Sequence, residues 1–158
     1  MLLYSCAAPK VVSYHDENVN FSEFETFNIA TETDVAAQST EEKDKIEAEI
    51  LDEMEARGYR FSENGEMNVQ YRIILEAKTN VHTDRRTTRY YGRQYRYYQT
   101  EVSRYSQGIL LVEITDNRTH KLLWSSSLDL SFNQKSREKK DLGGLIEMVF
   151  SKFPVAKE

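Results

Sequence analysis

The chain has 158 residues, the size of a single domain, and its 39% hydrophobic and 30% charged residues are typical of a globular protein rather than a disordered one. Its single cysteine excludes an internal disulfide and a cysteine-cluster metal site, and its formal net charge of −5 argues against a general attraction to nucleic acid or anionic lipid. No stretch of about 18 apolar residues is present, so the sequence predicts no membrane-spanning helix.

The only cysteine, Cys6, ends the tetrapeptide LYSC at residues 3–6. This tetrapeptide resembles the end of a bacterial lipoprotein signal, where a small residue precedes a cysteine that is lipidated and becomes the new N-terminus. A free cysteine without a role is the alternative. We interpret residues 1–9 as a lipobox remnant and tether, with the rest of the signal expected upstream, and residues 10–158 as one domain.

The first predicted elements are two strands and a helix. Residues 10–14 and 23–30 carry the aromatic, β-branched and threonine side chains typical of strands. Residues 40–57 place Ile46, Ile50 and Met54 on one face at intervals of four, and the other faces are acidic or basic. This spacing predicts an amphipathic helix, and the glycine that follows it is typical of a helix C-terminus.

Three more strands and a second helix are predicted in the remaining chain. Residues 69–78, 110–114 and 122–132 alternate between apolar and polar side chains, the pattern of a strand with one buried face. The turn-forming sequence at 116–119 joins the last two strands as a hairpin. Apolar residues at helical spacing in 142–153 predict the second helix, which ends before a proline.

The order strand, helix, strand, strand, strand, helix predicts the α+β fold class. We expect a two-layer sandwich in which an antiparallel sheet of about four strands is covered on one face by two helices. The apolar positions of these elements must meet between the layers. The core should therefore contain Ile50, Ile73, Trp124, Leu128 and Phe150.

Several motifs recur together along the chain: FSEFETF at 21–27, V-x-Y at 69–71, GILLVEITD followed by KLLW at 108–124, and FP at 153–154. In this order and spacing they resemble the domain of unknown function 4136 family, a family of bacterial envelope lipoproteins, over residues 14–154. The chain departs from the family where two serines follow Trp124, a place where Arg-Gly is frequent in the family.

The resemblance implies a lipid-anchored protein of the Gram-negative cell envelope with a fold like that of outer-membrane assembly lipoproteins. It implies a signal peptide, lipidation of Cys6 with palmitate among the acyl chains, and membrane attachment through that lipid. It also implies an outer-membrane lipoprotein that faces the periplasm. The family implies no catalytic residue.

The polar residues show no catalytic or metal-binding pattern. His15, His82 and His120 lack the spacing of metal ligands, and no glycine-rich phosphate loop is present. Ser125 and Ser127 alternate along a strand, about 7 Å apart, as on an ordinary sheet surface. We therefore predict no catalytic residue, no metal site and no cofactor, with a hydrolase that uses serine and histidine from separate elements as the alternative.

Residues 84–105 stand apart because they contain six arginines and six of the ten tyrosines, and they carry a net charge of +4 while the rest of the chain carries −9. Arginine and tyrosine are enriched at binding hot spots. We take this segment as an insertion in the domain, and its candidate binding residues are Arg85, Arg86, Arg89, Tyr90, Tyr91, Arg93, Tyr95, Arg96, Tyr97 and Tyr98.

Three interpretations of this segment remain open. It could be a twisted β-hairpin or loop without a partner, or a docking surface for an anionic envelope component or another envelope protein. Interleaved arginines and aromatic residues also suit an RNA-binding module. Because the whole chain is acidic, we expect no nucleic acid partner. The sequence thus predicts a non-catalytic, lipid-anchored envelope domain that serves as a binding or assembly accessory.

Overall fold

The computed structural model describes residues 11–31, 40–130 and 141–154. The chain divides into two compact units. We call the first unit, Met1–Ile74 with Gly108–Glu158, the body, and the second, Leu75–Gln107, the arm. The arginine- and tyrosine-rich insertion predicted at 84–105 lies within the arm.

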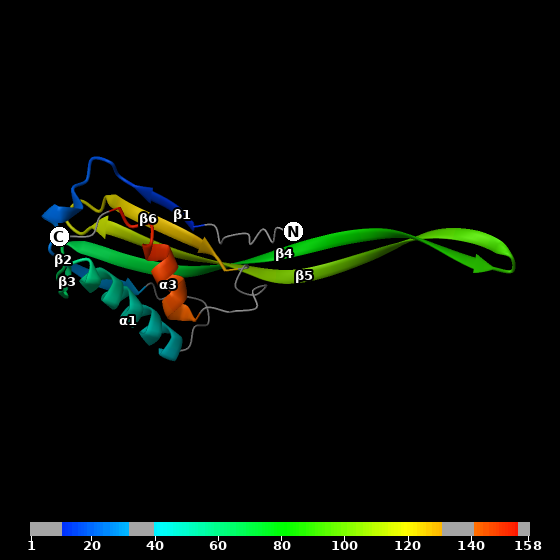
Figure 1. Cartoon of the computed structure of the whole chain (residues 1–158), viewed down its shortest axis with the longest axis horizontal. Helices are drawn as coiled ribbons and strands as arrows, with labels where there is room; N and C mark the ends of the chain where they lie inside the picture. The colour runs from blue at the N-terminus through cyan, green and yellow to red at the C-terminus, as the bar shows by residue number, and fades with distance from the viewer. Residues whose placement is uncertain (1–10, 32–39, 131–140, 155–158) are drawn as a thin grey trace, which may run out of the picture. The chain divides into compact units, whose positions relative to one another are not determined.

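The described strands form one sheet of six (Figure 1). In chain order they are β1 (Val11–His15), β2 (Thr26–Thr31), β3 (Arg60–Phe61), β4 (Met67–Tyr90), β5 (Arg93–Asp116) and β6 (Leu122–Asp129). Their order across the sheet is β1-β6-β5-β4-β2-β3. The pairs β1–β6 and β6–β5 are antiparallel, whereas β2 runs parallel to both β3 and β4.

The predicted α+β class with two helices is confirmed, but the prediction of about four antiparallel strands is wrong. The sheet has six strands and is mixed. The parallel part arises because helix α1 (Thr40–Ala56) lies between β2 and the strands β3 and β4 in the chain. A helical crossover returns the chain to the end of the sheet from which it left, so the next strand runs in the same direction.

The two helices match their predicted positions closely. Helix α1 is followed by Gly58, whose φ of 90° gives the left-handed conformation that ends many helices. Helix α3 (Leu142–Phe150) begins at Asp141, whose side chain accepts a hydrogen bond from Gly144 N at 2.9 Å. The strand predicted at 23–30 starts only at Thr26, because a 3₁₀ turn, η1 (Phe21–Glu23), precedes it.

The core of the body lies between the two helices and one face of the sheet, and Figure 1 shows α1 and α3 beside each other there. The four predicted core residues Ile50, Trp124, Leu128 and Phe150 are fully buried, and Ile73 packs against them. The ring of Trp124 lies 5.4 Å from that of Phe150. The predicted core is therefore confirmed.

One side chain near the start of β6 differs from the predicted alternation. The pattern placed Leu122 toward the core, yet Leu123 is the more deeply buried, with 2% of its surface exposed. The register of β5 and β6 shifts there, because Ile114 pairs with Trp124 while Thr115 pairs with Leu122. This bulge inserts one extra residue and turns both Leu123 and Trp124 inward.

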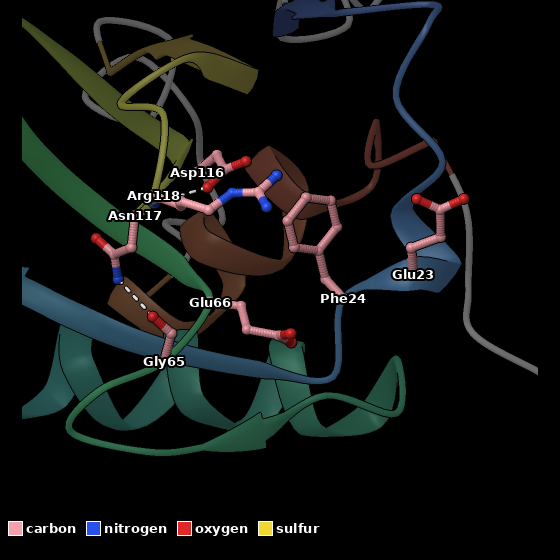
Figure 2. A pocket seen from close by; sticks show the side chains of 7 residues that line it. All are labelled: Glu23, Phe24, Gly65, Glu66, Asp116, Asn117 and Arg118. Atoms are coloured by element: carbon pink, nitrogen blue, oxygen red, sulfur yellow. Dashed lines mark hydrogen bonds between the residues drawn. The ribbon is translucent and has the colours of Figure 1, made fainter.

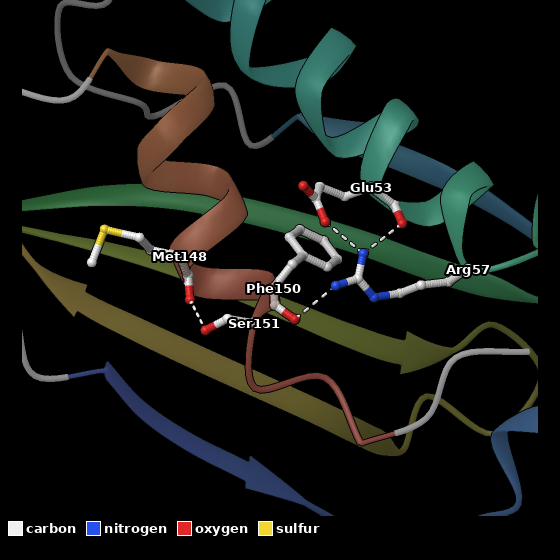
Figure 3. A network of polar contacts seen from close by, with 5 residues as sticks. All are labelled: Glu53, Arg57, Met148, Phe150 and Ser151. Carbon is white, nitrogen blue, oxygen red and sulfur yellow. Dashed lines mark hydrogen bonds and ion pairs between the residues drawn. The ribbon is translucent and has the colours of Figure 1, made fainter.

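The C-terminal ends of the two helices are joined by Arg57 (Figure 3). Its guanidinium donates to the carbonyl oxygen and carboxylate of Glu53, one turn back on α1, and to the carbonyl oxygen of Phe150 at 2.9 Å. It also lies over the rings of Phe150 and Phe153, 5.4 and 5.8 Å from their centres. Because α3 ends at Phe150, this carbonyl oxygen has no partner within the helix, and it accepts from both the arginine and the amide of Phe153, the latter at 2.9 Å.

Replacement of Trp124 by alanine should lower the free energy of unfolding by about 3–5 kcal/mol, the range for removal of a large buried aromatic side chain. The indole is fully buried and contacts the rings of Phe150 and Phe153. Urea unfolding followed by circular dichroism measures the loss. The matched control is Tyr14→Ala, because Tyr14 is 54% exposed on β1, and it should cost less than about 0.5 kcal/mol. Equal costs would contradict the assignment of the buried sheet face.

Candidate functional site

The arm is a β-hairpin formed by the distal parts of β4 and β5. The two strands are joined by the two-residue loop Tyr91–Gly92, in which both residues have positive φ, 47° and 73°. Two left-handed residues in succession form the type I′ turn that matches the twist of a hairpin. Glycine takes this conformation without strain, so Gly92 suits the second position.

The side chains of the arm alternate between its two faces. The hydroxyl oxygens of Thr83 and Thr100 lie 3.3 Å apart, which places these residues opposite each other on one face. His82 Nε2 lies 2.9 Å from a carboxylate oxygen of Asp84, which places these two residues together on the other face. Odd-numbered residues of β4 therefore share a face with even-numbered residues of β5.

The arm holds nine of the ten candidate binding residues with described side chains, and all nine are exposed. Tyr91 and Tyr98 are exposed over 90% and 72% of their surface, and Tyr95 and Tyr97 over 50% and 45%. Tyr90 lies at the end of β4, but its side chain is outside the described set. The structure thus places the predicted residues on one continuous hairpin.

A pocket of about 510 Å³ opens at the end of the body where β4 begins and β5 ends (Figure 2). Its lining residues are Glu23, Phe24, Gly65, Glu66, Asp116, Asn117 and Arg118. The sequence predicted the turn at 116–119 but not the pocket. Its three carboxylates and one guanidinium make the lining polar, and Phe24 is its aromatic side chain.

Two of these carboxylates hold the backbone together. Glu66 accepts hydrogen bonds from the amides of Glu25 at 2.7 Å and Thr26 at 3.2 Å. Asp116 accepts from the amides of Arg118 at 2.7 Å and Thr119 at 3.3 Å, as in an Asx turn. The hydrogen bonds of both side chains to the backbone account for their positions.

Asn117 joins three segments at the floor of this pocket. Its amide group donates to the side-chain oxygen of Asn28 and to the carbonyl oxygen of Gly65, both at 2.6 Å. A Cβ atom at Gly65 would meet the carbonyl carbon of Phe27 at 2.2 Å, so only glycine fits between these strands. Sequence reasoning missed this contact because its partners are 52 and 89 residues from Asn117.

A second polar cluster surrounds Asp16 at the end of β1. Its carboxylate pairs with Lys121 and accepts from the amide of Asn18 at 2.9 Å. The hydrogen bond from Lys121 is the main cause that holds the pKa of the Asp16 carboxyl below its ordinary value. The cluster closes the end of the β1–β6 pair, where the Asp16 amide donates to the Leu123 carbonyl oxygen.

Histidines and serines are not brought together. His15 is exposed on β1, His82 lies in the arm, and His120 occupies the β5–β6 turn with φ 58°. The buried Ser126 donates to the carbonyl oxygen of Val149 at 3.1 Å. Among the residues that the structure describes, no histidine bonds a serine, and no group of three or more His, Cys, Asp or Glu could hold a metal ion.

Cys6 lies outside the described residues, so its predicted lipidation stays a prediction. In the described part of the chain, no helix combines the length and the apolar character that crossing a bilayer requires.

Comparison with known proteins identifies the family. The family model described as "Domain of unknown function (DUF4136)" matches residues 11–155. The chain belongs to the DUF4136 family. The resemblance inferred from the sequence motifs is thereby confirmed. No curated protein matches the chain.

Two solved structures illustrate the shared fold of this DUF4136 chain. A DUF4136 family protein from Bacteroides thetaiotaomicron VPI-5482 is similar with a TM-score of 0.60 and 17% sequence identity, over 92% of this chain and 96% of that one. The PelC dodecamer from Paraburkholderia phytofirmans gives a TM-score of 0.52 and 10% identity, over 96% of this chain and all of the PelC chain. At these identities the likeness is one of fold.

The carboxyl group of Asp116 should make stability sensitive to acid. Burial raises its pKa, but hydrogen bonds from the Arg118 and Thr119 amides and the Arg118 charge lower it by more, so the folded pKa lies below the ordinary value. The stabilisation is complete above the unfolded pKa of about 3.9 and is lost as the pH falls through the folded pKa. Asp116→Asn should therefore reduce the acid-induced loss by up to about 1 kcal/mol.

Urea midpoints measured from about pH 5 down to about pH 2 test this expectation. The matched control is Glu63→Gln, at an exposed carboxylate between β3 and β4. A profile for Asp116→Asn that parallels the wild-type profile would show that the turn carboxylate does not contribute.

Proposed function

We propose that this chain is a non-catalytic, lipid-anchored domain of the bacterial envelope that faces the periplasm, and that its arm is a docking element. Attachment to the membrane is through a lipid on Cys6. The arm binds an anionic envelope component or another envelope protein. In this role the body is the scaffold that presents the hairpin.

The observation that supports the proposal is the exposure of the arm. Every described side chain of the hairpin, at 79, 81–89 and 91–102, is exposed. Exposed tyrosines and arginines do not stabilise a core, yet they are the side chains that most often dominate binding energy. Five arginines in this set, Arg85, Arg86, Arg89, Arg93 and Arg96, form no ion pair with a described residue, so their charges are available to a partner.

The body supports the alternative of a hydrolase less well than the arm supports binding. Two of the three carboxylates that line its pocket, Glu66 and Asp116, bond backbone amides, and its buried Ser126 donates to a helix carbonyl. A nucleophile needs a base within hydrogen-bond reach, and the described histidines lie elsewhere. We therefore favour binding over hydrolysis.

RNA binding through the arm is the second candidate, because arginines alternate with aromatic rings that could stack on bases. The rest of the chain carries −9, which repels a phosphate backbone. An acidic protein or an anionic surface component that contacts only the hairpin is repelled less by the negative charge of the rest of the chain.

Lipidation predicts a covalent label on Cys6. The full-length gene product, expressed in a Gram-negative host with labelled palmitate, should incorporate the label and partition into detergent. Cys6→Ala should lose both properties, with Ser5→Ala as the neighbouring control that keeps them. Equal labelling of the Cys6→Ala variant would overturn the anchor.

Removal of the hairpin should separate binding from folding. Residues 84–99 can be excised and Thr83 joined to Thr100 by Asn-Gly, because these two threonines already face each other across the hairpin. The excision removes all ten candidate residues. The urea midpoint should stay close to that of the intact protein, since loop-closure cost changes by only ~0.6 kcal/mol per doubling of loop length.

Immobilised intact and excised proteins are then compared for capture from envelope extract at low and high salt. Components that the arm binds through charge should be retained by the intact protein at low salt, released by salt and absent with the excised protein. A set of captured components that does not change on excision would contradict a docking role for the arm.

A further inference from the structure

The two faces of the arm differ in charge. Among the arm residues with described side chains, alternation set by the Thr83–Thr100 contact places three arginines and no acidic residue on one face. We call this the cationic face, and the charged residues described on it are Arg85, Arg89 and Arg96. Tyr98, which is 72% exposed, lies on the same face.

The opposite face of the arm is close to neutral. The arginines described on this face, Arg86 and Arg93, are balanced in charge by Asp84 and Glu101. A partner that recognises charge therefore meets the cationic face. A second arm would be repelled, because each arm holds seven basic and three acidic residues and carries +4.

The surface with the opposite charge lies on helix α1. Its 17 residues include eight acidic and two basic side chains. The exposed stripe opposite the buried Ile46, Ile50 and Met54 is what we call the acidic stripe, and it consists of Glu41, Asp44, Ala48, Asp52 and Glu55.

Most carboxylates of the acidic stripe are available. Glu41 pairs with Lys45 at 2.9 Å. Asp44, Asp52 and Glu55 form no ion pair with a residue that the structure describes, whereas Glu53 and Glu47 on the flank of the helix are paired. Ala48, in the middle of the stripe, has a short side chain, so another chain can approach the helix closely there.

The spacing of the two surfaces also fits. Arg85 and Arg89 are four residues apart on a strand, a distance of ~13 Å. Asp44 and Asp52 are eight residues apart on a helix, a distance of ~12 Å. Two arginines of the cationic face can thus meet two carboxylates of the stripe at the same time, and Arg96 and Glu55 lie beside them. Arginine forks suit carboxylates because both are planar and can bond bidentately.

We propose that the cationic face of the arm of one molecule docks on the acidic stripe of α1 of a second molecule. The partner is a second copy of this chain, because the same sequence carries both complementary surfaces. This proposal rests on the docking role of the arm and names its occupant. Since the two surfaces differ, each molecule can engage one neighbour with its arm and another with its helix, or the same neighbour twice.

The test measures the molar mass of the full chain carrying Cys6→Ala, so that neither a lipid nor an intermolecular disulfide joins the copies. Sedimentation velocity is run over a range of concentrations at about 20 mM and about 500 mM salt, between which the screening length falls severalfold. The wild-type surfaces should give species heavier than a monomer at low salt, and these should dissociate at high salt.

Two charge-reversal variants locate the contact. Arg85→Glu/Arg89→Glu/Arg96→Glu and Asp44→Lys/Asp52→Lys/Glu55→Lys should each weaken self-association about tenfold or more, because three exposed ion pairs become repulsions. A mixture of the two variants should associate again, since the acidic arm of one then faces the basic helix of the other. All positions are exposed, and circular dichroism checks that each variant is folded.

The controls carry charge reversals elsewhere. Arg86→Glu/Arg93→Glu changes the opposite face of the arm, and Glu17→Lys/Glu63→Lys/Glu147→Lys changes exposed carboxylates that are not part of α1. Both should retain self-association. Failure of the mixed variants to associate, or equal weakening in the controls, overturns the proposal.

A wild-type chain that stays monomeric at low salt also overturns self-docking, but it leaves the docking role itself to the excision experiment. If the arm still captures a salt-released envelope component, the arm docks on something other than a second copy. If it captures nothing, both proposals fail together.

Discussion

Among the described residues of the body, one face of the sheet is apolar and the other is polar, and this constraint organises the body. Both helices must lie on that face, so they must also pack against each other. Arg57 joins their C-terminal ends through Glu53 and the Phe150 carbonyl oxygen, while Trp124 joins the sheet to the aromatic rings of α3 and the residues after it. Removal of apolar surface from water supplies most of the stabilisation, and these contacts set the geometry in which it occurs.

The uncovered face of the sheet carries the contacts that polar residues make across strands. Arg72 on β4 bonds Glu113 on β5 at 2.6 Å, and Asn28 on β2 bonds Asn68 on β4 at 3.0 Å. Such pairs fix the register of neighbouring strands without a second layer. Where the two strands continue into the arm, their described side chains at 79, 81–89 and 91–102 are exposed and do not belong to the core of the body.

The distribution of charge follows from the different structural roles of the body and the arm. The body places its carboxylates on the outer surface of α1, where the helix needs polar residues to face water. The described side chains of the arm are exposed, so their composition is free to serve contact with other molecules. An acidic chain with a basic hairpin results, and the two signs of net charge lie on different units of the chain.

The sequence by itself determined the elements whose signals are local. The apolar spacing of Ile46, Ile50 and Met54 predicted α1, the alternation around Trp124 predicted a buried strand face, and the composition of 84–105 identified the arm. Such signals can be recognised within a single strand or helix because side-chain direction repeats every two residues in a strand and about every 3.6 residues in a helix. The family motifs are also read along the chain, and the family match confirmed them.

Only the tertiary structure decided what depends on contacts between distant residues. The parallel pairing of β2 with β4, the bulge that buries Leu123, and the bonds of Asn117 to Asn28 and Gly65 join segments far apart in the sequence. The division of the arm into a cationic and a neutral face required the pairing of its strands, because a shift of one residue would exchange the faces. Pairing partners are chosen by packing and twist over the whole sheet, and no window of sequence contains that information.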